Sequence, residues 1–355
     1  DKLKESGRSM VRPWGFAPRN AGPVSDARMT EEYTSVQQPL YSTLPGADDM
    51  NKVPGCCRIR SASRSNQRII MLNRGVGGNG FMVCKDCGAA MPGNHGDALK
   101  GLSRPYKSYA KTAACKHEHA ENIDLGYDFI TDMLVLEIAL DEQRLDARPK
   151  ESQWLARAAQ SLAEALRLAV SKEMDIEFTE LVAGYRQRSN SNGTFVDIYL
   201  YDSLSSGAGY AVGVEGKITE ILHRTKELLK GCDCDSSCYH CLKHYRNQFV
   251  HGFLDRFAAL DLLRWGQEGK IPPALSLDKQ KDLIGGIQHI LEHEGVYLSD
   301  ASDGITLSGR NGKALRLVIY PVMWKEPKEE GTVFVSDAYI KYAKPYAVER
   351  IIKAF

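Results

Sequence analysis

The sequence predicts an α+β fold in which a mixed sheet carries packed helices and clustered cysteines staple the loops. Helical periodicity in some segments and apolar runs typical of strands in others favour this mixture. Nine cysteines gather mainly at two places along the chain. With 355 residues, 43% of them hydrophobic, the chain can bury a large core, so small size does not explain the cysteines.

The N-terminal segment, residues 1–55, is rich in Gly, Pro, Ser and Arg and shows little periodicity. Trp14 and Tyr41 stand close to prolines, and we expect an extended arm laid over another surface. Farther on, GVGGNG (75–80) leads into the apolar run FMVC (81–84). It lacks the G-x4-G-K-[ST] pattern of a phosphate loop and predicts a hairpin turn instead.

The central segment predicts a strand, a helix, a hairpin and a second helix in that order. Residues 123–140 are strand-like around an apolar centre, and residues 151–174 place apolar side chains on one helical stripe. Residues 177–185 and 193–202, joined through RSNSNG, predict a β-hairpin. Residues 207–229 then predict the second helix, preceded by a glycine-rich turn.

The C-terminal part predicts a third helix at 253–267 and a linker at 270–276. Beyond the linker, residues 282–355 predict a helix, two strands and a final helix. No internal repeat and no low-complexity tract is found.

Charge and hydropathy exclude several classes of protein. Lys plus Arg total 46 and Asp plus Glu total 45, and this net charge of +1 argues against a protein that coats nucleic acid through overall charge. No apolar run approaches the roughly 18 residues of a membrane span, and no signal-peptide pattern is found. Clustered cysteines indicate a reducing compartment, so we expect a cytoplasmic protein. Because the chain begins with Asp1, we expect a fragment or a processed piece of a longer protein.

The segment 51–120 is locally basic. It holds twelve Lys or Arg residues against three acidic ones, a local charge of +9. Scattered basic residues commonly form a solvated surface, but this density also suits a patch that faces phosphates or an acidic partner. The candidate DNA-binding residues are Arg58, Arg60, Arg64, Arg68 and, farther along the chain, Arg246.

The strongest motif is Cys232-x-Cys234-x3-Cys238-x2-Cys241. Such spacing suits tetrahedral zinc, because each thiolate needs only ~2.3 Å to reach the ion. Reduced cysteines without metal are one alternative, but clustered thiols would be redox-labile. A redox-active CxxC is another, but it usually stands alone at a helix start. Four protein ligands close the site, so we expect structural rather than catalytic zinc.

A second zinc site is predicted upstream, from a CxxCG knuckle and the motif CKHEH (115–119). The predicted ligands are Cys84, Cys87, Cys115 and either His117 or His119, with His95 as a remote candidate. Cys56 and Cys57 are adjacent and cannot easily both point to one ion, so we expect them not to be ligands. The cofactor prediction is therefore two Zn²⁺ per chain.

No catalytic constellation stands out, and we predict no catalytic residue. The sequence shows no Ser-His-Asp order, no HExxH, no Walker A, no DExH-type box and no arginine-finger motif. Asp202 ends a predicted strand, and we expect its carboxylate to cap the turn that follows. A metal-dependent nuclease that uses Asp202 and His251 is the enzymatic alternative. Arg246 and Asn247 are open to two interpretations: contact with phosphates or bases, or the more usual pairing with acidic residues of their own domain.

Three stretches in one order resemble the MrfA-like zinc-binding domain: LYDSLSSGAGYA (200–211), CDCDSSCYHCLKHYRNQ (232–248) and LDRFAALDLL (254–263). FMVCKDCG, CKHEH and LGYDFITDML (125–134) are similar to the region that precedes this domain, so the resemblance covers roughly residues 80–265. The domain lies at the C-terminus of many bacterial superfamily 2 DNA helicases, and it occurs in DrmB of the DISARM antiphage system and in the large Druantia helicase. By that resemblance the family's zinc is held by Cys232, Cys234, Cys238 and Cys241.

The resemblance implies a zinc-binding accessory module of an ATP-dependent DNA helicase or translocase in antiphage defence or DNA repair. Such a module would contact DNA or clamp the motor, which would belong to the same polypeptide or to a separate subunit and would supply the chemistry. The nuclease and a protein-interaction scaffold without DNA contact are the alternatives. We expect four segments: an arm (1–55), a basic zinc-knuckle segment (56–122), an MrfA-like zinc-binding core (123–275) and a C-terminal α/β segment (276–355).

Overall fold

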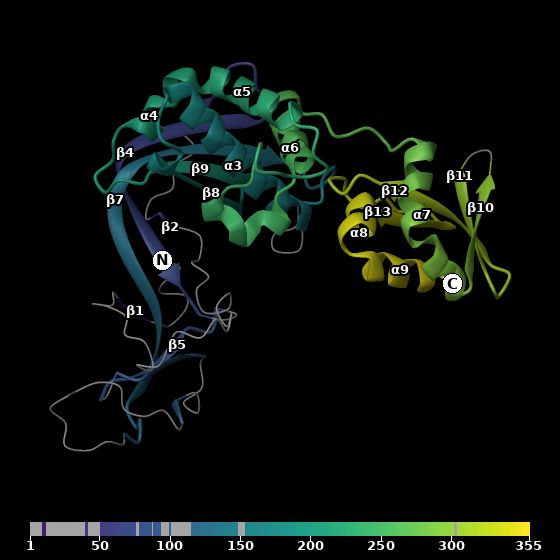
Figure 1. Ribbon diagram of the computed structural model, residues 1–355, viewed down its shortest axis with the longest axis horizontal. Coiled ribbons are helices and arrows are strands. Elements are labelled where there is room, and N and C mark those ends of the chain that lie inside the picture. The colour runs from purple at the N-terminus through teal and green to yellow at the C-terminus, as the bar shows by residue number, and fades with distance from the viewer. Residues whose placement is uncertain are drawn as a thin grey trace. The chain divides into compact units, whose positions relative to one another are not determined.

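The structure, a computed structural model of the chain, is drawn in Figure 1. It describes residues 9–11, 40–41, 50–75, 78–86, 88–93, 99–100, 115–147, 153–301 and 304–355. Most of the predicted N-terminal arm, including Trp14, lies outside these residues. The chain divides into two compact units. Unit 1 comprises residues 1–45, 64–132 and 204–208, and unit 2 comprises residues 46–63, 133–203 and 209–355.

Unit 1 is built on strands in the order β2-β4-β7-β5-β6, with β1 parallel to β7. Its strands are β1 (Ser9–Val11), β2 (Leu40–Tyr41), β4 (Ile59–Asn73), β5 (Phe81–Cys84), β6 (Ala90–Pro92) and β7 (Ala120–Leu140). The long strands β4 and β7 run on into unit 2. Because β7 lies between β4 and β5, the loop at 75–80 does not join paired strands, and the prediction of a hairpin turn there is wrong.

Unit 2 contains the second half of the β7 strand, a hairpin and a layer of helices. These elements are β3 (Asn51–Lys52), α3 (Gln153–Met174), η4 (Phe178–Glu180), β8 (Leu181–Asn190), β9 (Gly193–Asp202), α4 (Tyr210–Gly213), η5 (Glu215–Lys217), α5 (Ile218–Lys230), η6 (Tyr245–Phe253) and α6 (Arg256–Glu268). Residues 133–140 of β7 pair antiparallel with β9, and β9 pairs with β8. The predicted hairpin is confirmed, with a turn of two residues that is shorter than RSNSNG.

The core of unit 2 lies between this sheet and α3, α5 and α6 (Figure 1). The predicted stripe of α3 is buried, and α3 packs against α5 and α6. On α6, a Cβ atom at Gly266 would lie 2.7 Å from the Ile59 side chain, so only glycine fits there. Beside it, the fully buried Trp265 donates a hydrogen bond of 2.8 Å to the carbonyl of Ala139.

The predicted helix at 207–229 is wrong as one continuous helix, because it is divided into α4, η5 and α5. Two glycines with positive φ, Gly207 (77°) and Gly209 (83°), form the turn that precedes α4. The buried carboxylate of Asp202 accepts hydrogen bonds from the backbone N–H groups of Tyr210 (3.1 Å) and Ala211 (2.8 Å). The prediction that Asp202 caps this turn is therefore confirmed.

The last part of unit 2 has a hydrophobic cluster of its own. Its elements are α7 (Leu277–His293), β10 (Val296–Ala301), β11 (Gly304–Gly309), β12 (Ala314–Tyr320), β13 (Thr332–Ser336), α8 (Asp337–Tyr342) and α9 (Lys344–Ile352). The sheet order is β10-β11-β12-β13, antiparallel except for the parallel pair β12 and β13. The predicted pattern of helix, two strands and helix missed two of these strands. With two sheets that both mix strand directions and with packed helices, the structure confirms a mixed α/β fold. The division into four segments stays a prediction.

Candidate metal centre

Four cysteines converge in the loop that follows α5. Their sulfur atoms form a closed set in which each Sγ lies within 4.8 Å of the others. The shortest separations are 3.5 Å (Cys232 to Cys234 and to Cys238), 3.7 Å (Cys234 to Cys241) and 3.8 Å (Cys238 to Cys241). For Zn–S bonds of ~2.3 Å, the edge of a tetrahedron of sulfurs is about 3.8 Å. The cluster therefore fits one tetrahedral zinc ion.

The backbone of the knuckle also favours bound thiolates. The N–H of Cys238 donates to Cys241 Sγ (3.2 Å), and the carbonyl of Cys238 accepts the N–H groups of the next turn from Cys241, Leu242 and Lys243. A backbone hydrogen bond at His240 lowers the pKa of Cys238 to about 7, whereas burial raises the pKa of Cys241 to about 12. Thiols must lose their protons to bind zinc, and the lowered pKa of Cys238 favours its thiolate form.

Arg256, at the start of α6, ties this cluster to the helices. The buried guanidinium donates to the carbonyl of Cys234 (2.9 Å) through Nε and to the carbonyl of Leu229 (3.0 Å) through Nη1. The backbone N–H of Arg256 donates to the carbonyl of Ser236 (2.8 Å). One side chain thus connects the end of α5, the cysteine loop and α6.

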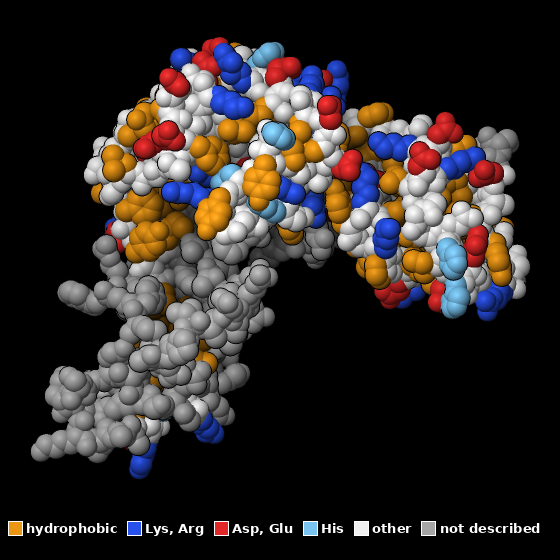
Figure 2. All heavy atoms as spheres, viewed as in Figure 1, with side chains coloured by type: hydrophobic (Ala, Val, Ile, Leu, Met, Phe, Trp, Pro, Cys, Tyr) orange, Lys and Arg blue, Asp and Glu red, His pale blue; other side chains and the backbone are white. Residues whose placement is uncertain are grey.

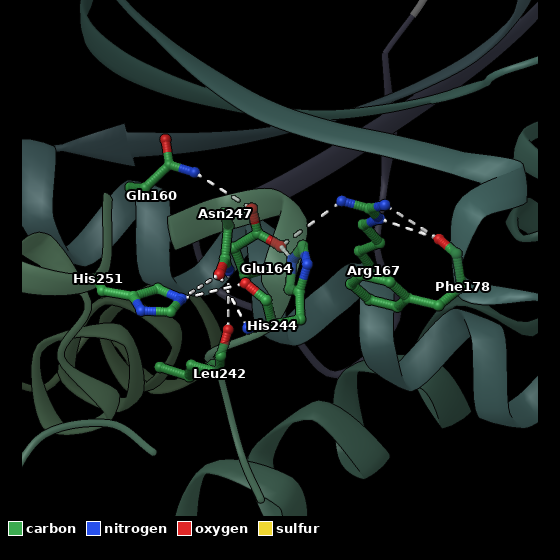
Figure 3. Close-up of polar contacts among 8 residues, drawn as sticks. All are labelled: Gln160, Glu164, Arg167, Phe178, Leu242, His244, Asn247 and His251. Carbon is green, nitrogen blue, oxygen red and sulfur yellow. Dashed lines mark hydrogen bonds and ion pairs between the residues drawn. The ribbon is translucent and has the colours of Figure 1, made fainter. Parts of the chain in front are cut away.

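Helix η6, which follows the knuckle, is held by Asn247 (Figure 3). The buried amide of Asn247 donates to the carbonyl of Leu242 (2.9 Å), and its Oδ1 accepts the N–H of His244 (2.9 Å). The ring Nε2 of His251 lies 2.9 Å from the same Oδ1 and 3.1 Å from the carbonyl of His244. Asn247 therefore pairs within its own domain, but with backbone groups and His251 rather than with the acidic residues that the sequence suggested.

A second polar group joins η6 to α3. The buried carboxylate of Glu164 lies 3.0 Å from Nε2 of His244 and 3.7 Å from Nη1 of Arg167 (Figure 3). Arg167 also donates to the carbonyl of Phe178 (3.0 Å), and its guanidinium lies 3.9 Å from the centre of the Phe178 ring. No local motif predicts the contact of Glu164 with His244, because the two residues lie 80 positions apart in the chain.

The upstream motifs bring three candidate ligands together in unit 1. Cys84 Sγ and Cys115 Sγ are 3.7 Å apart, and His117 completes a group of ligand atoms within 4.8 Å of one another. The ring of His119 lies instead against Asp86, with Nδ1 3.0 Å from Oδ2. The geometry therefore favours His117 over His119. Cys87 and His95, also considered as ligands, lie outside the described residues.

Two candidate DNA-binding arginines have structural partners in unit 2. Arg60 Nε donates to the buried carboxylate of Glu137 at 2.7 Å. The guanidinium of Arg58 lies 4.2 Å from the centre of the Trp265 ring. Arg58 packs on α6, whereas Arg60 pairs with a carboxylate of β7 within the sheet, so substitution of either residue would also disturb the fold.

The other candidates reach solvent to different extents. In unit 1, Arg64 is half-buried, and the exposed Arg68 pairs with Asp128 at 2.9 Å. In unit 2, Arg246 is exposed on η6, directly after the cysteine cluster. For the nuclease alternative, Asp202 and His251 belong to no metal-binding group among the described residues.

The four cysteines pack against the core that contains α3, α5 and α6, and their number and geometry fit the closed ligand set of a zinc-binding module. Residues 162–242 match the family model of the MrfA Zn-binding domain. The resemblance predicted from the sequence is thereby confirmed, and zinc is the metal that it supports.

One curated relative extends the similarity along almost the whole chain. Over 342 residues the chain is 31% identical to Druantia protein DruE of Escherichia coli (strain UMEA 4076-1), which covers 92% of this chain. The match covers 19% of DruE, so the chain spans about a fifth of the length of this relative.

Two solved structures of the DUF1998 helicase MrfA also match, both at 15% identity. The structure bound to DNA has a TM-score of 0.38 and covers 65% of this chain and 25% of that chain. The structure bound to DNA and AMPPNP has a TM-score of 0.22 and covers 39% and 24%. Within the described part of the chain, no helix combines the length and apolar character needed to cross a membrane.

Proposed function

We propose that this chain is a zinc-binding accessory module of an ATP-dependent DNA helicase or translocase in antiphage defence or DNA repair. The observation that carries the proposal is the tetrahedral set of four sulfurs at the end of a segment that matches the MrfA Zn-binding domain. The identity with DruE, which is named as a Druantia protein, supports the defence setting. The partners would be DNA and a superfamily 2 motor, and the cytoplasm would keep the thiols reduced.

In this proposal the module works through structure rather than catalysis. Zinc would fix the loop between α5 and η6 through its ligands Cys232, Cys234, Cys238 and Cys241. Hydrogen bonds of Arg256 and Asn247 would connect this loop to the neighbouring helices. The motor would supply the phosphoryl transfer. A scaffold that contacts only protein is the alternative, and DNA binding separates the two.

The salt dependence of DNA affinity is the test. We expect weak, sequence-independent binding whose affinity falls steeply as salt is added, because each neutralised phosphate releases counterions. Arg246→Glu is expected to weaken binding of a labelled duplex several-fold and to reduce the salt slope by about one. Fluorescence anisotropy at several salt concentrations measures both.

Lys328→Glu is the matched control, because Lys328 is also exposed but lies in the loop between β12 and β13. It is expected to bind DNA like the unmodified chain. If the unmodified chain shows no salt-dependent binding, the basic residues face an acidic protein surface and the scaffold alternative is correct.

We further propose a second zinc ion in unit 1, held by Cys84, Cys87, Cys115 and His117. The short distance between Cys84 Sγ and Cys115 Sγ supports this site. We expect Cys115→Ser to lower the zinc content, measured by mass spectrometry of the metal, from two ions per chain to one. His119→Ala should keep both ions. A single ion in the unmodified chain would contradict the second site.

A further inference from the structure

Two sets of contacts between aromatic and cationic side chains lie on the knuckle, η6 and the elements next to them. The ring of Tyr239, within the knuckle, meets the ring of His251 edge to face at 5.5 Å. Two residues farther along η6, the Phe253 ring lies 5.0 Å from the guanidinium of Arg157, which itself lies 4.3 Å from the ring of Tyr342 on α8. We call these five residues the aromatic ladder.

Three aromatic rings of the ladder are exposed to solvent. Tyr239 is 72% exposed, Phe253 42% and Tyr342 47%. Large apolar side chains that gather on a surface commonly mark a binding site, whereas single ones need no explanation. Figure 2 shows hydrophobic, basic and histidine side chains close together on one face of unit 2.

The ladder is held in place before any ligand arrives. Arg157 Nη1 donates to the carbonyl of Gly252 (3.0 Å), and Tyr342 Oη donates to the carboxylate of Asp255 (2.9 Å). His251 is fixed by Asn247, as described above. Surfaces with fixed side chains lose little conformational entropy on binding, which favours recognition.

The surrounding charges indicate the kind of ligand. Tyr245, 80% exposed, stands next to the exposed Arg246 and close to Lys243, so cations alternate with rings. The negative charges nearby are those of the exposed Asp233 and Asp235 and of the zinc–thiolate cluster, whose charge would be about −2. Because these charges nearly balance, phosphate contacts alone would give only weak binding here, and the cations do not suit an apolar protein partner.

Ring faces interspersed with a few cations are the features that bind single-stranded nucleic acid, whose bases are free to stack. A duplex hides the faces of its bases, so it gains nothing from exposed rings. We propose that the aromatic ladder binds unpaired bases of single-stranded DNA. The bases would stack on Tyr239, Phe253 and Tyr342, and the phosphates would meet Arg157, Lys243 and Arg246. This inference rests on the proposed function in DNA transactions.

The test compares a labelled oligo(dT) with a labelled duplex on the full chain. Stacking contributes about 1–3 kcal/mol per base, so the double substitution Tyr239→Ala and Phe253→Ala should weaken oligo(dT) binding at least about tenfold. Duplex binding should change less than about twofold. Tyr239→Ala alone, at a largely exposed residue, should lower oligo(dT) affinity without affecting the melting temperature.

Two matched variants control this experiment. Tyr342→Phe keeps the ring and should retain the affinity, whereas Tyr342→Ala should lose part of it. Tyr297→Ala removes a tyrosine of β10 that is also exposed (51%) and lies outside the ladder, and it should bind oligo(dT) normally.

The outcomes separate the ladder from the broader proposal. If the chain binds DNA but the ladder variants bind oligo(dT) as tightly as the unmodified chain, the ladder proposal is wrong and the proposed function stands. An equal loss for oligo(dT) and duplex also overturns it, because phosphates would then carry the binding. If the unmodified chain binds neither DNA, both proposals fall.

Discussion

Replacing Cys238 with serine is expected to remove one zinc ion per chain and to destabilise unit 2. Cys238 Sγ lies 3.5 Å from the sulfur of Cys232 and 3.8 Å from that of Cys241, so its loss opens the tetrahedron. Loss of a metal is among the few single changes that cost more than about 4 kcal/mol. For a unit of this size we expect the melting temperature to fall by about 10 °C. Differential scanning fluorimetry and metal analysis measure the two effects.

Cys57→Ser is the control for this experiment, because Cys57 is exposed and belongs to no group of ligand atoms among the described residues. It should keep both the zinc content and the melting temperature. The structural role of the cluster would be disproved by a Cys238→Ser protein that loses its zinc but melts like the unmodified chain.

The sequence predicted best those features that depend on residues close together in the chain. The spacing of the four cysteines predicted that their sulfurs converge, and the apolar stripe around Leu162 predicted α3. The capping role of Asp202 followed from a polar residue between a strand and a glycine-rich turn. Each of these features depends on interactions between residues near one another in the chain, so its sequence pattern can be recognised before the tertiary structure is known.

The features that the sequence did not reveal depend on contacts between distant residues. Glu164 meets His244 across 80 positions, and Arg60 meets Glu137 across 77. The strand order β4-β7-β5 also depends on distant contacts, because the sequence of the loop at 75–80 does not determine which strands pair. The strand β13 was missed because it ends directly at α8, with Ser336 as the cap, and leaves no loop to separate the two patterns.

Arg256 shows how such a distant contact supports the zinc cluster. Its guanidinium satisfies the carbonyls of Cys234 and Leu229, which come from two different elements. It also places a positive charge near a cluster of about −2, which favours bound thiolates over free thiols. Without it, two carbonyl groups would lose their hydrogen bonds, and buried groups left unpaired are costly.

Arg256→Met, which keeps the apolar stem of the side chain, is therefore expected to destabilise unit 2 by about 2–4 kcal/mol and to speed the release of zinc to a chelator. Arg256→Lys should recover part of the loss, because an ammonium group is able to reach one carbonyl but lacks the planar fork that serves both. Arg264→Met, at an exposed position of the same helix, should change stability by less than about 0.5 kcal/mol. Thermal melting and the rate of zinc transfer to a chromogenic chelator are the measurements. Equal behaviour of the Arg256→Met and Arg264→Met proteins in both would show that the zinc loop is held without Arg256.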